Sequence, residues 1–198
     1  MIMKNQLSDS DQQKIDEISR HIEAIIRLVG EDPAREGLLK TPQRSAKALY
    51  YLTSGYRVNP GEMIEQALFD HEGSKIIVVK DIEFYSMCEH HILPFFGRIS
   101  IGYIPDGKII GLSKVARVVN AYARRLQVQE RLTAQICDEI KATAGAKGVI
   151  AVCNAQHLCM KMRGVEKQDS STTTIDYNGV FEDNQSLRDE FMRMLAVK

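Results

Sequence analysis

The sequence has no excess of charge of either sign and no long apolar run, and each absence excludes a class of partner. Lysine plus arginine and aspartate plus glutamate number 26 each among 198 residues. No overall positive field therefore draws the chain onto nucleic acid or an anionic membrane. No apolar run approaches the length of a membrane span, and residues 1–13 lack the apolar segment of a signal peptide. We therefore expect a cytoplasmic protein with no nucleic-acid or membrane partner, in which any anion site is local.

Cysteine is scarce, with four residues, and histidine numbers five. In a reducing compartment so few cysteines are metal ligands or free thiols rather than a disulfide framework. Most isolated Cys and His side chains are simply buried or hydrogen-bonded in a core, and for Cys137, His21 and His71 we adopt that interpretation. The other six lie in two short windows, residues 88–91 and 153–159, which favours a shared metal site.

The first window, Cys-Glu-His-His, places Cys88 and His91 three residues apart. A tight turn at this spacing can direct both side chains at one ion, and zinc accepts sulfur together with nitrogen. Two ligands do not hold zinc, so we expect the second window to supply Cys159. Three protein ligands leave the fourth position to water, which is typical of a catalytic rather than a structural site.

Two histidines are then left over as acid or base, His90 and His157. On a predicted strand His157 and Cys159 face the same way, whereas Cys153 lies roughly 13 Å from His157. We therefore do not expect Cys153 to share the metal.

Apolar periodicity, capping residues and turn residues predict the secondary structure. The predicted elements are helices at 11–29, 41–53 and 60–68, strands at 75–88, 98–104 and 108–111, helices from 113 and at 129–144, strands at 149–159 and 171–175, and a helix at 186–195.

This order predicts an α+β fold, an antiparallel four-stranded sheet with helices on one face and the chain order strand-strand-helix-helix-strand-strand. We expect residues 1–70 to form an N-terminal helical extension and residues 71–198 the catalytic domain. The two Cys/His windows follow the first and third strands and converge at one rim of the sheet. The open face and edges of such a sheet favour a homo-oligomer.

Four stretches closely resemble the zinc-dependent GTP cyclohydrolase I family. They are Ser-Met-Cys-Glu-His-His at 86–91, Gly-Leu-Ser-Lys at 111–114 with Arg117, Arg-Arg-Leu-Gln-Val-Gln-Glu-Arg-Leu-Thr at 124–133, and His-Leu-Cys-Met-Lys-Met-Arg-Gly-Val at 157–165. The resemblance spans residues 41–174. It implies the tunnelling fold and a ring of ten subunits with active sites at subunit boundaries.

The resemblance also implies a reaction. The imidazole ring of GTP is opened by hydrolysis, formate leaves, the ribose rearranges and the ring recloses to 7,8-dihydroneopterin triphosphate, the first step of tetrahydrofolate and pterin synthesis. Zn²⁺ held by Cys88, His91 and Cys159 would supply the hydroxide. His157 would donate to the ring nitrogen, and His90 either moves a proton or is a spectator next to the metal.

The same resemblance implies substrate contacts. A carboxylate that accepts from the ring N–H and exocyclic amine separates guanine from adenine, and Glu130 matches that position with Gln129 beside it. Without the resemblance Glu130 is an ordinary helix-surface residue. The matched phosphate-binding residues are Lys114, Arg117 and Arg163, with a weaker match at Arg44 and Lys47, and Ser113 matches a residue near the ribose.

The chain departs from the family pattern at Cys153 and Asn154 and in the tail after residue 174. Two other interpretations stay open. One is a zinc-stabilised module that binds purine nucleotides without converting them, and the other is a tunnelling-fold relative that acts on a different pterin or deazapurine. Histidines left over beside an incomplete ligand set favour the enzyme.

Overall fold

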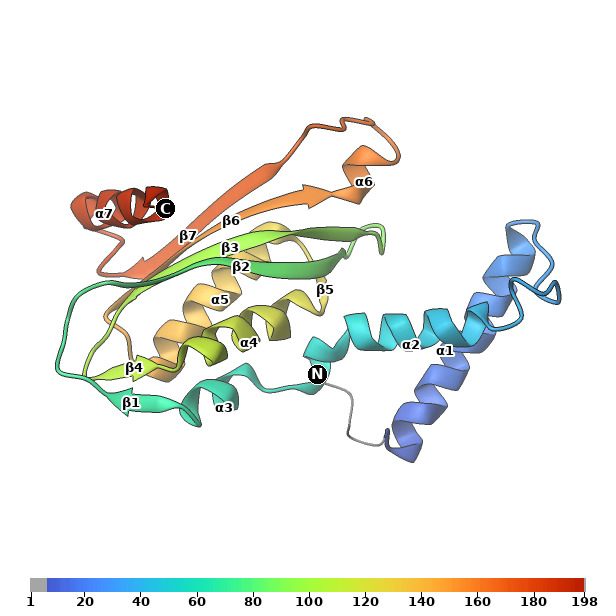
Figure 1. Ribbon diagram of the computed structural model, residues 1–198, viewed down its shortest axis with the longest axis horizontal. Coiled ribbons are helices and arrows are strands. Elements are labelled where there is room, and N and C mark those ends of the chain that lie inside the picture. The colour runs from blue at the N-terminus through green and yellow to red at the C-terminus, as the bar shows by residue number, and fades with distance from the viewer. Residues whose placement is uncertain (1–6, 198) are drawn as a thin grey trace. The chain divides into compact units, whose positions relative to one another are not determined.

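The computed structural model describes residues 7–197, so residues 1–6 of the predicted extension lie outside the described residues. Contacts divide the chain into two compact units, the first ending at Thr53 and the second beginning at Ser54 (Figure 1). Residues 54–70, which the sequence assigned to the extension, belong to the second unit. The domain boundary at residue 70 remains a prediction.

The first unit is a helix pair, α1 (Asp9–Leu28) and α2 (Thr41–Leu52). The side chain of Ser8 accepts from the Asp11 amide at 3.1 Å and caps α1, and a proline in the first turn starts α2. Ile15 of α1 packs with Ala46 and Tyr50 of α2. Both predicted helices are confirmed.

The second unit holds the remaining elements. They are a 3₁₀ turn (Ser54–Arg57), α3 (Pro60–Glu65), β1 (Leu68–Asp70), β2 (Ile77–Cys88), β3 (Pro94–Ile104), β4 (Lys108–Ile110), α4 (Leu112–Ala123), β5 (Leu126–Gln127), α5 (Gln129–Ala144), β6 (Gly148–His157), α6 (Leu158–Lys161), β7 (Thr172–Gly179) and α7 (Gln185–Ala196).

These strands form a mixed α+β architecture around one five-stranded sheet with the order β5-β2-β3-β6-β7. The four long strands pair antiparallel, and in the chain they occur as two strands, then α4 and α5, then two strands. The two-residue strand β5 pairs parallel to the end of β2, which strand patterns could not show because it is too short to alternate. β1 and β4 form a separate two-stranded sheet.

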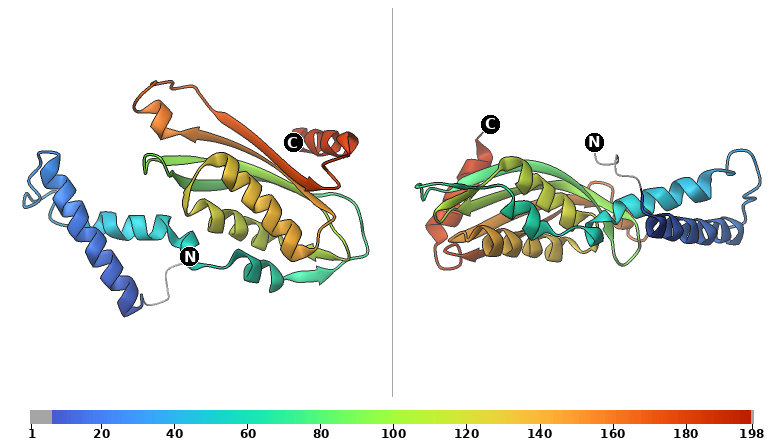
Figure 2. Two further views of the ribbon diagram at one scale, coloured as in Figure 1. Left: turned by 180° about the vertical axis from the view of Figure 1, so that it is seen from behind. Right: turned by 90° about the horizontal axis from the view of Figure 1, so that it is seen from below.

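Helices lie on both faces of the sheet, which corrects the prediction of a single covered face (Figure 2). On one face α4 and α5 pack over side chains such as Phe84, Ile99 and Ala151. On the other, Phe191 of α7 packs with Ile150. The apolar stripe of α7 finds room there because β3 carries Gly102, where an added Cβ would meet the Phe191 ring at 2.7 Å.

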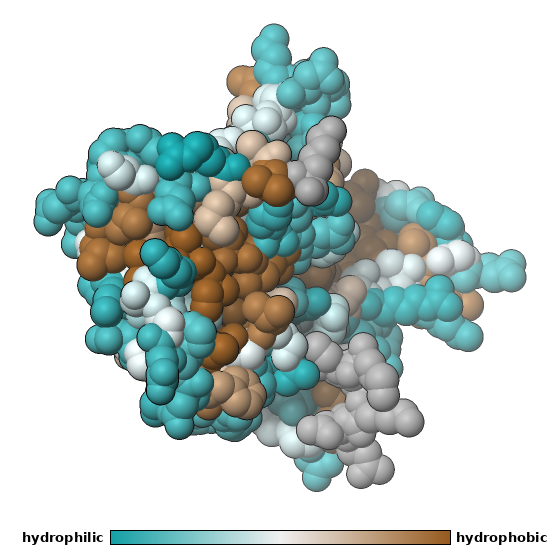
Figure 3. All heavy atoms as spheres, turned by 60° about the vertical axis from the view of Figure 1, so that its left-hand side comes forward, coloured by the Kyte–Doolittle hydropathy of each residue, from teal (hydrophilic) through white to brown (hydrophobic). Residues whose placement is uncertain are grey.

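Hydrophobic residues also reach the surface, and Figure 3 shows them gathered in one area on the side of the second unit that it presents. Within residues 7–197 no helix has both the length and the apolar character that a bilayer span requires.

Candidate metal and catalytic site

Three predicted metal ligands come together at one rim of the sheet. The ligand atoms of Cys88, His91 and Cys159 lie within 4.8 Å of one another, and Cys88 Sγ is 3.7 Å from His91 Nδ1. A tetrahedral zinc with bonds of about 2.3 Å to sulfur and 2.0–2.1 Å to nitrogen sets neighbouring ligand atoms roughly 3.5–3.8 Å apart. The donor types and spacing therefore fit zinc after a small contraction.

A tight turn after β2 brings the first two ligands together. The Ile92 and His91 amides both donate to the Cys88 carbonyl, at 2.8 and 3.3 Å, and the Cys88 amide donates to the Leu93 carbonyl at 2.8 Å. Ile92 adopts φ = 53°, in the left-handed region that is unusual for a branched residue. The chain reverses within four residues, so Cys88 and His91 are held near each other.

The third ligand comes from a helical turn, which corrects the expectation that His157 and Cys159 share a strand. β6 ends at His157, and Cys159 lies in α6, where the Met162 amide donates to the Leu158 carbonyl at 3.0 Å. The pairing explains the change. β3 accompanies β6 only as far as His157, and β7 only as far as Ala155, so no strand remains to extend the ladder.

The surroundings of Cys159 favour its neutral thiol. Burial and then the neighbouring Cys88 thiol raise the pKa of Cys159. Two thiols this close resist ionisation together unless a positive charge lies between them. Cys153 is not in the ligand group found among residues 7–197 and is fully buried on β6.

His157 lies two residues before Cys159 and is held on two sides. Its ring stacks on Phe95, the residue opposite on β3, with centroids 4.7 Å apart and planes 2° from parallel. Its Nε2 is 2.8 Å from Oε1 of Gln129. Burial lowers the pKa of His157, and the negative charge of Glu130 opposes part of that shift. The imidazole is therefore neutral at neutral pH.

Gln129 and Glu130, which the sequence grouped as guanine-binding neighbours, lie in different environments at the start of α5. The Gln129 side chain is buried, and its Nε2 lies 3.0–3.1 Å from the carbonyls of Cys153 and Thr172 and from Thr174 Oγ1. Glu130 is exposed. The Glu130 carboxylate is therefore accessible to a ligand, whereas the Gln129 amide is hydrogen-bonded to groups within the protein.

Arg131, the next residue of α5, ties the helix to the metal-binding turn. It forms an ion pair with Glu89 and also donates to Gln127 Oε1 at 3.0 Å and to the Leu126 carbonyl at 3.1 Å. The guanidinium lowers the pKa of Glu89. The sequence prediction did not include this pair or Phe95, although Glu89 and Arg131 stand inside two of the recognised motifs.

The remaining predicted residues are less constrained. His90 is 64% exposed, with Nε2 3.8 Å from Glu89 Oε1 and its ring centroid 6.1 Å from that of His91. Ser113, Lys114 and Arg117 lie in the first two turns of α4. Arg163 follows α6 and its charge acts on the Cys159 thiol.

Arg44 and Lys47 lie on α2 in the first unit and are exposed. Among the described side chains, no carboxylate lies within ion-pair distance of Lys114, Arg117, Arg163, Arg44 or Lys47. All five predicted phosphate-binding cations are therefore available to an anion.

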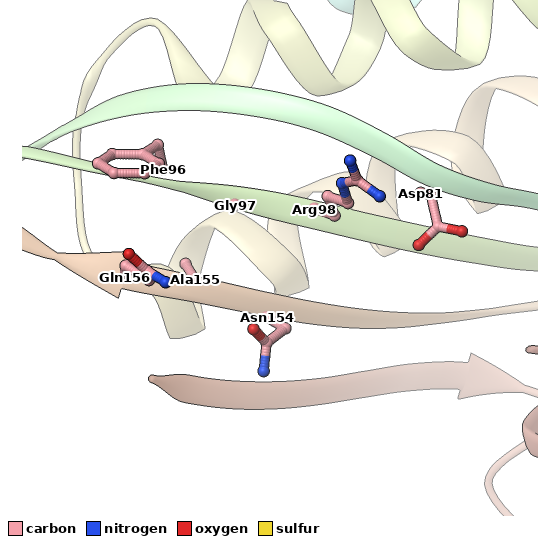
Figure 4. A pocket seen from close by; sticks show the side chains of 7 residues that line it. All are labelled: Asp81, Phe96, Gly97, Arg98, Asn154, Ala155 and Gln156. Atoms are coloured by element: carbon pink, nitrogen blue, oxygen red, sulfur yellow. The ribbon is translucent and has the colours of Figure 1, made fainter. Parts of the chain in front are cut away.

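A separate shallow hollow lies on the sheet between β3 and β6 (Figure 4). It is lined by Asp81, Phe96, Gly97, Arg98, Asn154, Ala155 and Gln156. Arg98 there already pairs with Glu83 at 3.2 Å. None of the predicted site residues lines this hollow, so it is not the candidate site.

Comparison with known proteins gives consistent matches. A profile of the family described as GTP cyclohydrolase I matches residues 18–196. GTP cyclohydrolase 1 of Chlorobaculum tepidum is 51% identical over 188 residues, which cover 95% of this chain and 84% of the relative. GTP cyclohydrolase 1 of Porphyromonas gingivalis is 53% identical over 179 residues, covering 90% of this chain and 92% of the relative. A solved apo structure of an archaeosine synthase QueF-Like aligns with 55% of this chain and 97% of its own, at 16% identity and a TM-score of 0.44.

Proposed function

The chain belongs to the GTP cyclohydrolase I family, and from this premise we propose that the Cys88, His91 and Cys159 cluster binds Zn²⁺ at the centre of its active site. The function is that of a GTP cyclohydrolase I, and the protein is a hydrolase. The observation that carries the proposal is the three-ligand cluster, whose sulfur and nitrogen atoms lie within 4.8 Å. Zinc bound there lowers the pKa of a water molecule and so supplies a nucleophile at neutral pH.

The proposed reaction opens the imidazole ring of GTP, releases formate and, after rearrangement of the ribose, gives 7,8-dihydroneopterin triphosphate. His157 is the proposed proton carrier. Its neutral ring takes up the proton that the attacking water loses and returns it to the ring nitrogen whose bond to carbon breaks. The lowered pKa of His157 favours release of that proton. His90, exposed beside Glu89, is the proposed second proton carrier.

Glu130 is the proposed guanine-reading residue. Its exposed carboxylate can accept from the ring N–H and the exocyclic amine of guanine, a donor pair that adenine lacks. Gln129 supports this position from within the chain, because its buried side chain anchors the first turn of α5 to β6 and β7.

The triphosphate is the proposed partner of the unpaired cations. Lys114, Arg117 and Arg163 belong to the same compact unit as the metal cluster. For Arg44 and Lys47 on α2, the role of phosphate ligand is proposed from the match to the family alone. Ser113 is the proposed ribose contact. Guanidinium groups suit this role because they bind phosphate oxygens in pairs.

We further propose the tunnelling fold for residues 71–198 and a homodecamer with active sites at subunit boundaries. The antiparallel order β2-β3-β6-β7 supports this, because closing such sheets into a ring removes their edges. The balanced charge and the reduced cysteines support a cytoplasmic enzyme of folate and pterin synthesis.

The direct test is incubation of the purified, zinc-loaded protein with GTP. We expect stoichiometric formate and, after oxidation, a fluorescent pterin. ATP in place of GTP serves as the control and should give neither product. Binding of GTP without formate would instead support the nucleotide-binding module, and a product other than a pterin would support a relative with a different substrate.

A further inference from the structure

The side-chain amide of Gln129 lies in an unusually complete set of contacts. Its Nε2 faces three acceptors, the Cys153 carbonyl at 3.0 Å, the Thr172 carbonyl at 3.0 Å and Thr174 Oγ1 at 3.1 Å. Its Oε1 faces Nε2 of His157 at 2.8 Å. The side chain is 1% exposed, so water does not supply alternative partners.

These partners fix which end of the amide is which. Two of the three acceptors are backbone carbonyls, which cannot donate a hydrogen bond. Turning the amide over would place Oε1 against both carbonyl oxygens and leave these two acceptors without their donor, at a cost of about 1–3 kcal/mol per unsatisfied group. The orientation of Gln129 therefore follows from its surroundings, and Oε1 is the atom that faces His157.

An oxygen acceptor at this position decides where His157 carries its proton. Oε1 of Gln129 has no hydrogen to donate, so Nε2 of His157 must be the donor in the 2.8 Å contact. We propose that Gln129 is a positioning residue that keeps the Nε2 hydrogen of His157 in a hydrogen bond inside the chain, and so leaves Nδ1 as the ring nitrogen without a protein partner. The tautomer assignment does not depend on the proposed function. Only the identity of the molecule that exchanges a proton with Nδ1 rests on it.

Two further observations support this assignment. The Phe95 stack fixes the plane of the His157 ring. A half-turn of the ring within that plane would put a carbon in place of Nε2 opposite Gln129 Oε1, so the 2.8 Å hydrogen bond keeps the ring in this orientation. Within residues 7–197 no protein group hydrogen-bonds Nδ1. In the proposed reaction a water proton moves to Nδ1, giving an imidazolium that keeps its Nε2–H on Gln129, and the same proton then passes from Nδ1 to the substrate nitrogen.

The network behind Gln129 is closed by two threonines. Thr133 Oγ1 donates to the Gln129 carbonyl at 2.8 Å, and Thr133 Oγ1 and Thr174 Oγ1 are 2.8 Å apart. Thr174 can then donate to Thr133 while it accepts from Gln129. Thr133 therefore offers a matched control, because it belongs to the network without touching His157.

The test is ¹⁵N nuclear magnetic resonance of the zinc-loaded full-length protein carrying ¹⁵N-labelled histidine, at a mildly alkaline pH. The signal that disappears in His157→Ala identifies His157. We expect wild-type His157 to carry its proton on Nε2. A wild-type proton on Nδ1 would overturn the proposal.

The variants are Gln129→Met, which keeps the length of the side chain without the acceptor, and Thr133→Val as the control. We expect Gln129→Met to lose the pure Nε2–H signal and to lower kcat about 10- to 100-fold at an unchanged KM for GTP. Thr133→Val should keep the signal. A Gln129→Met protein with the wild-type tautomer would contradict the proposal, and if that variant does not fold, the wild-type spectrum decides alone.

Failure here is separable from failure of the proposed function. A wild-type protein with Nε2–H that produces no formate from GTP would refute the function and leave the tautomer assignment standing. A wild-type protein that converts GTP with Nδ1–H would refute the positioning role of Gln129 alone.

Discussion

Two polar clusters lie at the same rim of the sheet and differ in how far their polar groups are satisfied. In the metal cluster, the Cys88 thiol and the His91 ring have each other as partners at 3.7 Å, and His91 is exposed. In the Gln129 cluster, the side-chain amide and the Thr133 and Thr174 hydroxyls all have partners at 2.8–3.1 Å. The first is an open set of ligands, and the second is a closed network.

The degree to which the polar groups are satisfied explains the role of each cluster. Soft ligands whose contacts with one another are long and weak gain most of their interaction energy from an ion that arrives from outside. A closed network gains nothing from a ligand and instead holds a neighbouring group in one orientation. Chemistry is therefore expected at the open cluster, and the closed one determines the geometry of His157 beside it.

The largest expected effect comes from breaking the open cluster with Cys159→Ser. Removing one of three protein ligands should strip the zinc and abolish turnover. The loss should exceed the roughly 10- to 100-fold that the removal of an outer hydrogen-bond partner costs. Metal content is measured on the purified protein together with formate release, and normal zinc with full activity would disprove the ligand assignment.

His157→Ala tests whether His157, which contacts Gln129 and lies two residues before Cys159, is a proton carrier or a metal ligand. It should keep zinc, because the three ligands are untouched, while ring opening falls about 10²- to 10⁴-fold with loss of the proton carrier. Zinc content and single-turnover formate release separate the two effects. Loss of metal in this variant would place His157 among the ligands.

Glu130→Ala should have a smaller effect. It leaves the donor pair of guanine without an acceptor, at a cost of about 1.5–3 kcal/mol, so kcat/KM for GTP should fall roughly 10- to 100-fold. Zinc content and the melting temperature should not change. Glu190→Ala, an exposed glutamate on α7, is the matched control. If Glu130→Ala converts GTP normally, guanine is recognised elsewhere.

The smallest expected effect concerns Asp176, which lies two residues after Thr174 on β7. Burial, and to a lesser extent the charge of Asp138, raises the pKa of Asp176. Because the folded-state pKa lies above the unfolded one, the ionised carboxylate opposes folding at neutral pH, and that opposition disappears as pH falls through the folded-state pKa.

Asp176→Asn should therefore stabilise the protein at neutral pH by a few tenths of a kcal/mol, at most about 1, because the group is partly exposed. The expected rise in melting temperature is no more than about 4 °C. The advantage over wild type should shrink on acidification towards pH 4. A gain that does not change with pH would mean that the charge of Asp176 is not the cause.

The sequence predicted what local chemistry determines. The helix expected at 129–144 has the bounds found for α5, because its apolar spacing ends at Gly145, which adopts φ = 64° and stops the helix. The metal ligands could be grouped because two of them share one turn. The sequence predicted the closing helix, but only tertiary packing decided that α7 covers the second face of the sheet.

The closed network lay beyond sequence reasoning for a related reason. The partners of the Gln129 amide stand 24 to 45 residues further along the chain. Their meeting depends on the register of β6 and β7, in which Cys153 pairs with Thr174, and one residue of slip would turn those groups to the other face. Periodicity gives the faces of a strand but not this alignment.

The two-residue strand β5 fixes the spacing between the metal-binding turn and the start of α5. It pairs Leu126 with Met87 and Gln127 with Cys88, and α5 begins two residues later with Gln129 and Glu130. These two residue pairs therefore fix how far the carboxylate of Glu130, proposed to read guanine, lies from the metal-binding turn. An inserted residue in the segment 124–128 would move Glu130 by about one strand rise, roughly 3.3 Å, which is as long as a hydrogen bond. A change of length in this stretch should therefore disturb the site even when every side chain is kept.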